Sequence, residues 1–144
     1  TSSTPGKTRL IHFFRVEIGK TELMLVDLPG YGWAKVSKKE RDSWQRLIES
    51  YLEGRPQLRA AMLLQDLRRK ISEDETLLLE WLAERNVPSM VVVTKADKLK
   101  PMKRKNQIGM LKKSITAPTH AVVPTSSQSG DGIDLLWKQI RAMI

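Results

Sequence analysis

Asp27 follows the apolar run Leu23-Met24-Leu25-Val26 and begins the loop Asp27-Leu28-Pro29-Gly30. The run predicts a short strand that is buried on both faces of a sheet, and Pro29 and Gly30 end regular structure. An aspartate at the end of such a strand can hold a hydrated Mg²⁺, and the N–H of Gly30 can approach a phosphate oxygen. A tight strand-to-helix loop explains the same residues, so this motif alone leaves both interpretations open.

A second polar group follows another apolar strand, where Val91-Val92-Val93 leads into Thr94-Lys95-Ala96-Asp97. Asp97 can accept hydrogen bonds from both N1–H and the N2 amine of guanine, a pair that adenine does not offer. The stem of Lys95 can lie along the base while its ammonium braces the phosphate side. Further on, the backbone N–H groups of Thr125-Ser126-Ser127 can meet the guanine O6. The order of these loops predicts a guanine-nucleotide site and disfavours an ATPase.

The elements that must position these loops alternate between strands and helices. We expect strands over residues 10–16, 23–26, 58–65, 90–93 and 120–123, with a turn at Gly19-Lys20 that makes the first two antiparallel. Helices are expected after the capping boxes Ser37–Glu40 and Ser72–Glu75, after Pro101, and after Asp131 as a cap. This alternation predicts an α/β domain, residues 1–144, with a mostly parallel sheet covered on both faces.

The charge is +9 and is unevenly distributed. No Asp or Glu occurs from Lys98 to Gly130, whereas that stretch contains Lys98, Lys100, Lys103, Arg104, Lys105, Lys112 and Lys113. Such a surface favours a polyanion such as RNA, although a solvated lysine-rich helix face remains an alternative. The sequence has no cysteine, no signal-peptide pattern and no apolar run long enough to span a bilayer. We therefore expect a cytoplasmic protein without a zinc site and without membrane binding.

Gly6-Lys7-Thr8 superficially resembles a P-loop, but Thr1 stands where that motif needs its first glycine, and a strand-like run follows instead of a helix. The whole chain instead resembles the EngB (YihA/YsxC) family of bacterial GTPases. The segments that carry this resemblance are TPGKTRLIHFF, LVDLPGYGWAKVSKKERDSWQRLIESYL, LLQDLRR, TKADKLK and TSSQSGDGID. The resemblance implies a Ras-like P-loop GTPase fold that binds GTP or GDP with Mg²⁺. It also implies a monomer that assists assembly of the large ribosomal subunit, with rRNA and ribosomal proteins as partners.

The resemblance also implies the roles of individual residues. Thr8 corresponds to the switch threonine that reaches Mg²⁺, and Asp27 is the second metal-binding residue. Tyr31 stands where many GTPases have a water-orienting glutamine, so hydrolysis should be slow, and no catalytic residue is assigned. The implied nucleotide-binding residues are Gly6, Lys7, Thr8, Arg9, Leu10, Asp27, Leu28, Pro29, Gly30, Thr94, Lys95, Ala96, Asp97, Thr125, Ser126 and Ser127.

The family's first strand, its G-x-x-x-x-G-K-S loop and its first helix have no counterpart in this sequence. The absent strand belongs in the middle of the family's sheet, and the absent loop supplies most of the family's phosphate cradle. We therefore expect a partial GTPase domain that binds GTP weakly or not at all. The alternative is a non-enzymatic module that binds RNA or the ribosome through its basic surface and has no preference for guanine.

Overall fold

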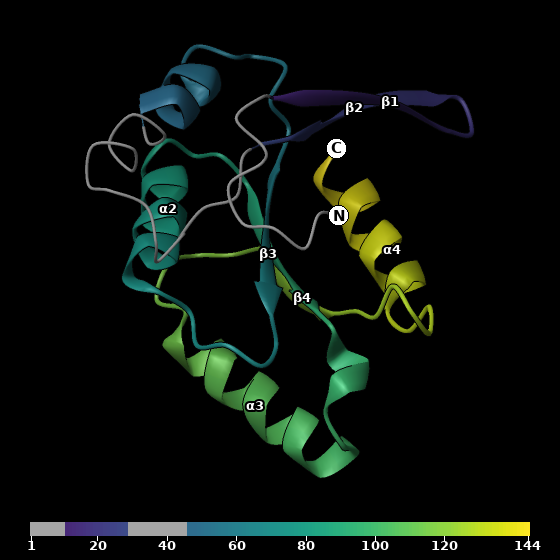
Figure 1. Cartoon of the computed structure of the whole chain (residues 1–144). Helices are drawn as coiled ribbons and strands as arrows, with labels where there is room; N and C mark the ends of the chain where they lie inside the picture. Colours follow the sequence, from purple (N-terminus) through teal and green to yellow (C-terminus); the bar gives the residue numbers. More distant parts are fainter. Residues whose placement is uncertain (1–10, 29–45) are drawn as a thin grey trace. The chain divides into compact units, whose positions relative to one another are not determined.

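The structure is a computed structural model that describes residues 11–28 and 46–144 (Figure 1). The chain forms two compact units, residues 1–55 and residues 56–144. The described strands form two separate sheets, one of two strands and one of three. The expectation that residues 1–144 make a single domain stays a prediction.

The first unit contains an antiparallel hairpin of β1 (His12–Ile18) and β2 (Thr21–Asp27). Gly19 turns the chain with a φ of 62°, which confirms the predicted turn. The prediction that the second strand is buried on both faces is wrong, because Met24 is 55% exposed and its neighbours are half-buried. A side chain of β2 is buried only where another layer covers the face on which it lies.

Residues 46–52, also in the first unit, are helical. Ile48 and Leu52, one turn apart, are buried, whereas Leu47 is 40% exposed. Gly54, with a φ of 68°, follows the helix in the left-handed conformation that commonly ends helices. The capping box predicted at Ser37–Glu40 lies outside the described residues.

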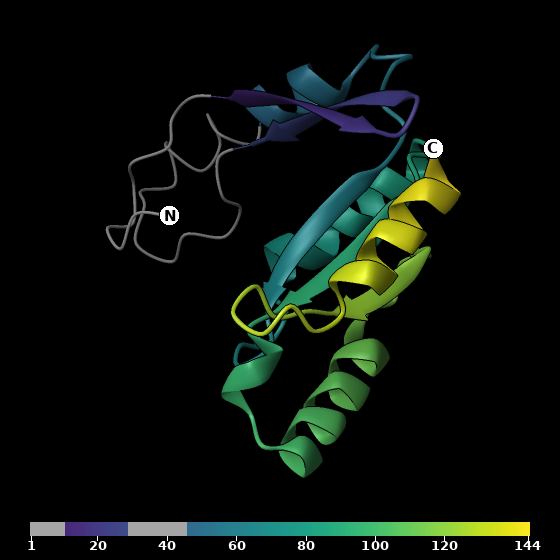
Figure 2. The ribbon, with the colours of Figure 1, turned by 90° about the vertical axis from the view of Figure 1, so that its right-hand side faces the viewer.

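The second unit contains a parallel sheet with the strand order β3-β4-β5. Its strands are β3 (Ala61–Asp66), β4 (Ser89–Thr94) and β5 (Ala121–Pro124). Its helices are α2 (Glu73–Glu84), α3 (Pro101–Ser114) and α4 (Ile133–Met143). Helices α2 and α3 cover one face of this sheet and α4 covers the other (Figures 1 and 2). The α/β architecture predicted from the sequence is therefore confirmed.

The core of the second unit is built around β4, the central strand. Met90, Val91 and Val93 have no exposed surface, because the strand is paired on both edges and covered on both faces. The cluster between the sheet and the α2–α3 layer consists of Leu63, Leu67, Leu79, Val91, Val93, Ala96, Leu111 and Ala117. This packing fixes the carboxyl end of β4 and the loop that follows it.

β3 differs from the predicted strand in its start and its burial. It begins at Ala61 instead of Leu58, since its ladder with β4 ends at Ser89, and Pro88 has no N–H to extend it. The apolar run over residues 58–65 is typical of a buried strand, but Met62 is 39% and Leu64 is 66% exposed. β3 is the edge strand of its sheet, and these two side chains alternate with those that face the core.

Of the two helix caps predicted in the second unit, the structure confirms one and contradicts the other. The Ser72–Glu75 capping box is confirmed, with both reciprocal hydrogen bonds present. The prediction that Asp131 caps the terminal helix is wrong, because the N-cap of α4 is Gly132 with a φ of 76°. A Cβ at position 132 would overlap the main-chain carbonyl of Pro124, so only glycine fits there without a shift of the backbone.

Candidate functional site

Two loops meet at the carboxyl ends of β4 and β5, the site that open parallel sheets offer to ligands. Lys95 leaves β4 in the left-handed conformation, with a φ of 59°, and a short 3₁₀ helix, Ala96–Lys98, follows. The amide of Ala96 donates to the carbonyl of Thr125 at 3.0 Å, and the amide of Thr125 donates to the carbonyl of Val93 at 2.7 Å. The structure therefore brings the Thr94–Asp97 and Thr125–Ser127 loops together, as their positions after parallel strands predict.

A short hydrogen bond joins the two loops through their side chains. The hydroxyl of Ser126 donates to Oδ1 of Asp97 at 2.7 Å, and Ser126 is fully buried. The amides of Gln128 and Ser129 both donate to the same hydroxyl oxygen at 3.2 Å. Because its hydroxyl is bonded on several sides, Ser126 holds the carboxylate of Asp97 in one orientation.

The carboxylate of Asp97 is ionised and keeps room for further donors. The hydrogen bond from Ser126 is the main reason that the pKa of Asp97 is lowered, and Lys98 lowers it further against the effect of burial. The ammonium of Lys98 lies 3.3 Å from Oδ2 of Asp97 and also donates to Gln128. A carboxylate offers about four acceptor positions and 21% of this side chain is exposed, so Asp97 can still accept from a ligand.

The backbone donors of the second loop are largely occupied. The amide of Ser126 donates to the carbonyl of Asp131 at 2.9 Å, and that of Thr125 is used in the contact with Val93. The amide of Ser127 has no hydrogen-bond partner among the described residues, and Ser127 is exposed. Of the three residues predicted to offer an N–H to guanine O6, Ser127 is the one whose amide is available.

An ion-pair cluster at the carboxyl end of β3 was not predicted as functional from the sequence. Asp66 accepts from Nε and Nη2 of Arg68, at 2.9 and 2.7 Å, and from the backbone amide of Arg68 at 3.0 Å. It also accepts from Nζ of Lys95 at 3.0 Å. These contacts, above all the hydrogen bond from the Arg68 side chain, hold the pKa of Asp66 well below its usual range. The sequence did contain a signal for Asp66, because a carboxylate directly after an apolar strand is the same feature that made Asp27 a candidate.

The other predicted site residues lie outside the described residues or in the first unit. Gly6, Lys7, Thr8, Arg9 and Leu10 lie outside the described residues, as do Pro29 and Gly30. Asp27 and Leu28 are described, but they belong to the first unit, where the carboxylate of Asp27 is exposed at the end of β2. In the described ranges, 11–28 and 46–144, no group of three or more His, Cys, Asp or Glu side chains is placed to hold a metal.

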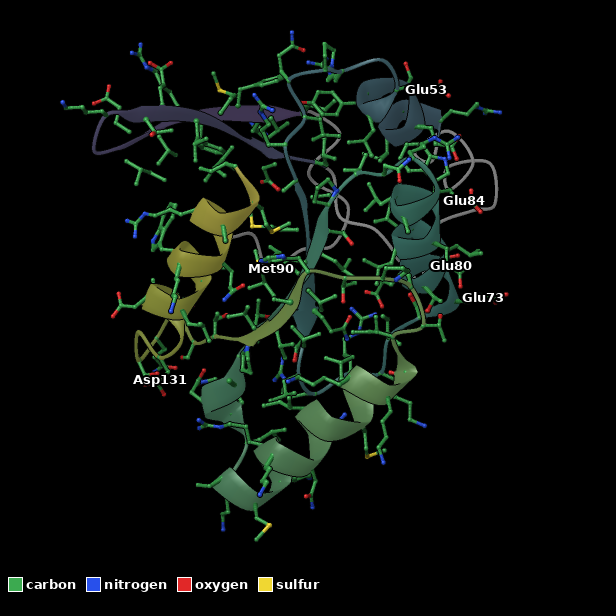
Figure 3. All side chains as sticks on the ribbon, turned by 180° about the vertical axis from the view of Figure 1, so that it is seen from behind. Glu53, Glu73, Glu80, Glu84, Met90 and Asp131 are labelled. Carbon is green, nitrogen blue, oxygen red and sulfur yellow. The ribbon has the colours of Figure 1, made fainter. Side chains whose placement is uncertain are left out.

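The basic segment predicted from the sequence lies on and around α3. Lys103, Lys105, Lys112 and Lys113 are exposed, and none of them has an acidic partner among the described residues. The acidic side chains labelled on α2, among them Glu80, lie on a different helix of the same unit (Figure 3). In the part of the chain that the structure describes, no helix is long and apolar enough to cross a membrane.

The sequence matches the family described as "50S ribosome-binding GTPase" over residues 1–95. It is 42% identical to the "Probable GTP-binding protein EngB" of Geobacter metallireducens over 144 residues, which are all of this chain and 69% of that protein. It is also 42% identical to the protein of the same name from Levilactobacillus brevis, with 99% of this chain and 71% of the relative covered.

The fold is similar to that of solved GTP-binding proteins. A crystal structure of a probable GTP-binding protein engB matches with a TM-score of 0.70 and 22% identity, covering 92% of this chain and 83% of that one. A GTP-binding protein from Sulfolobus solfataricus, solved in complex with GDP, matches with a TM-score of 0.64 and 21% identity over 92% of this chain and 43% of that protein. At these identities the likeness shows the fold, which is that of the P-loop GTPases.

Proposed function

Since this chain belongs to the EngB family of GTP-binding proteins, we propose that its Thr94–Asp97 and Thr125–Ser127 loops bind the base of a guanine nucleotide. The observation that carries this proposal is the ionised carboxylate of Asp97, which the hydroxyl of Ser126 orients at 2.7 Å. A charged acceptor that is both fixed and partly exposed suits a planar ligand edge with two adjacent donors.

Each polar edge of guanine then has a partner in these loops. Asp97 accepts from N1–H and from the N2 amine, and the free amide of Ser127 donates to O6. Adenine has an acceptor at N1 and a donor at its exocyclic nitrogen, so it would set like groups against Asp97 and Ser127. With adenine, the carboxylate of Asp97 would lack donors and the amide of Ser127 would lack an acceptor, and unpaired polar groups of this kind make discrimination strong.

The experiment that tests this proposal is an NMR titration of the 144-residue chain with GDP up to millimolar concentration. We expect the largest amide shift of the second loop at Ser127, and a loss of GDP affinity of at least about tenfold in Asp97→Asn. Asp131→Asn is the matched control, because its exposed side chain belongs to the neighbouring loop and has no contact with Asp97. Equal GDP affinity of the two variants would contradict the assignment of Asp97.

We further propose that Thr8 and Asp27 hold a Mg²⁺ ion and that Asp27-Leu28-Pro29-Gly30 approaches the phosphates. Hydroxyl and carboxylate oxygens are the ligands that Mg²⁺ prefers, and the carboxylate of Asp27 is exposed at the end of β2. When bound, the ion neutralises charge on the phosphate oxygens. With GTP present, Mn²⁺ should broaden the amide signals of Asp27 and Leu28, and it should not do so in Asp27→Asn.

As its cellular role, we propose assistance in assembly of the large ribosomal subunit, with rRNA as the ligand of the basic α3. Four exposed lysines of α3, none with an acidic partner in the described part of the chain, favour a phosphate backbone, because each contact releases counterions. Replacing Lys103, Arg104 and Lys105 by Glu should weaken binding to large-subunit precursor particles and make its salt dependence shallower. If the triple variant binds as tightly and with the same salt slope, α3 is only a solvated face. The non-enzymatic alternative is not favoured, since the relatives matched are GTP-binding proteins.

A further inference from the structure

We propose that Asp66 is a positioning residue that holds Lys95 toward the end of β3, so that a bound nucleotide extends from its base site in that direction. This inference rests on the guanine-binding function proposed above. It gives a role to the cluster of Asp66, Arg68 and Lys95, in which Asp66 and Arg68 were not expected from the sequence to belong to the site.

The geometry separates the two charged residues of the Thr94–Asp97 loop along the edge of the sheet. Asp97 reaches toward the loop after β5, where Ser126 holds it, whereas Lys95 reaches the opposite way and donates to Asp66 at the end of β3. The register places Asp66 opposite Thr94, directly before Lys95, so this contact follows from the pairing of β3 with β4. A nucleotide whose base lies at Asp97 therefore meets the Lys95 stem on its β3 side.

Asp66 is suited to hold an ammonium without neutralising the site. Its side chain is only 13% exposed, and Arg68 contributes two side-chain hydrogen bonds and one backbone hydrogen bond that fix the carboxylate. The pKa of Asp66 is lowered by these contacts, so the group is ionised at neutral pH. One carboxylate and two cations leave the cluster with a net charge of +1, which favours an approaching phosphate.

Lys95 needs such a partner because its long side chain is flexible and 53% exposed. An ammonium that is already held in place loses less conformational entropy when the nucleotide binds, and that reduction appears as affinity. The Gln65 side chain supports the turn, since its amide nitrogen donates to the carbonyls of Asp66 and Arg69 at 3.3 and 3.2 Å. The turn that carries Arg68 is thus tied to the end of β3 by side-chain hydrogen bonds.

A double-mutant cycle in the 144-residue chain tests this inference, with GDP affinity measured by NMR titration for the unmodified chain, Asp66→Asn, Lys95→Met and the double variant. Asp66→Asn should weaken GDP binding about fivefold to tenfold, and this effect should disappear when Lys95 is Met. An equal loss in both backgrounds would mean that Asp66 is only structural, and no loss would also overturn the inference. If Asp66→Asn does not fold, Asp66→Glu replaces it in the cycle, and a roughly threefold or larger loss that Lys95→Met abolishes is expected.

The result for Asp97→Asn keeps this inference distinct from the proposed function. If Asp97→Asn weakens GDP binding and Asp66→Asn does not, only the positioning role fails. If Asp97→Asn has no effect on GDP binding, the guanine site fails and the positioning role fails with it. In the expected case, adding Asp66→Asn lowers the guanosine diphosphate affinity of the unmodified chain and the xanthosine diphosphate affinity of Asp97→Asn by the same factor. The factor is the same because Lys95 does not contact the base edge that distinguishes the two nucleotides.

Discussion

Gly132 and Gly130 form a matched pair that tests how the second loop of the site is held. Both have a left-handed backbone, with φ values of 76° and 79°. A Cβ at Gly130 would meet nothing within 4 Å. A Cβ at Gly132 would overlap the carbonyl oxygen of Pro124 and lie 3.1 Å from its carbonyl carbon and 3.3 Å from Cα of Thr125. Alanine at the two positions therefore differs in steric overlap and not in backbone strain.

The magnitudes follow from these two effects. A non-glycine residue in the left-handed region costs about 1–2 kcal/mol, which applies to both variants. Overlap with backbone atoms requires a shift of the chain and adds typically about 1–3 kcal/mol. We expect Gly130→Ala to lower the free energy of unfolding by about 1–2 kcal/mol and Gly132→Ala by about 2–5 kcal/mol.

Urea denaturation followed by circular dichroism measures both free energies, and the same proteins are then titrated with GDP. Gly132→Ala should also weaken GDP binding, because it displaces Thr125 in the second loop of the site. The carbonyl of Thr125 accepts from the amide of Ala96 in the first loop. Equal losses of stability in the two variants, or a Gly132→Ala protein as stable as the unmodified chain, would refute the steric role of Gly132 at this helix start.

Three further outcomes are expected from single substitutions. Because the pKa of Asp66 is lower in the folded than in the unfolded chain, its contribution to stability is present above its ordinary value of 3.8 and is lost as the pH falls below it. The difference in stability between the unmodified chain and Asp66→Asn, followed by urea denaturation across acidic pH, should therefore shrink on acidification; a constant difference would count against the ion pairs. Ser72→Ala should lower the free energy of unfolding by about 0.5–2 kcal/mol through loss of the capping box, and an unchanged urea midpoint would count against that cap. Gly109→Ala, in open space on α3, should raise the melting temperature by stabilising the helix by about 0.5–1 kcal/mol, and a lower melting temperature would contradict this.

The parts of the fold that the sequence predicts are those set by local signals. The β-branched run at Val91–Val93 marks a central strand, and Ser72 with Glu75 marks a helix start, so both appear where expected. Because strands that run in parallel end at one edge of the sheet, the sequence alone is enough to place the Thr94–Asp97 and Thr125–Ser127 loops together.

The features that the sequence did not predict depend on contacts between distant segments. The pair of Asp66 and Lys95 follows from the register of β3 against β4, which no local pattern reveals. The N-cap of α4 is Gly132, although aspartate is the better N-cap by residue type. The need for glycine there comes from the carbonyl of Pro124, which leaves no room for a Cβ. The exposure of Met24 depends on which face of β2 another layer covers, whereas an apolar run indicates only that a side chain can be buried.

The most direct test of the guanine assignment uses this chain with the family's first strand, G-x-x-x-x-G-K-S loop and first helix added before Thr1. GTP and xanthosine triphosphate are titrated side by side into this extended protein and into its Asp97→Asn variant. The substitution keeps the shape of the side chain but replaces one acceptor by a donor, which opposes the N2 amine of guanine and suits the carbonyl of xanthine. We expect the variant to lose at least about tenfold in GTP affinity, roughly 1.4 kcal/mol, and to gain affinity for xanthosine triphosphate. Unchanged GTP binding without any gain for the xanthine nucleotide would show that Asp97 only caps its loop, and would contradict the guanine site.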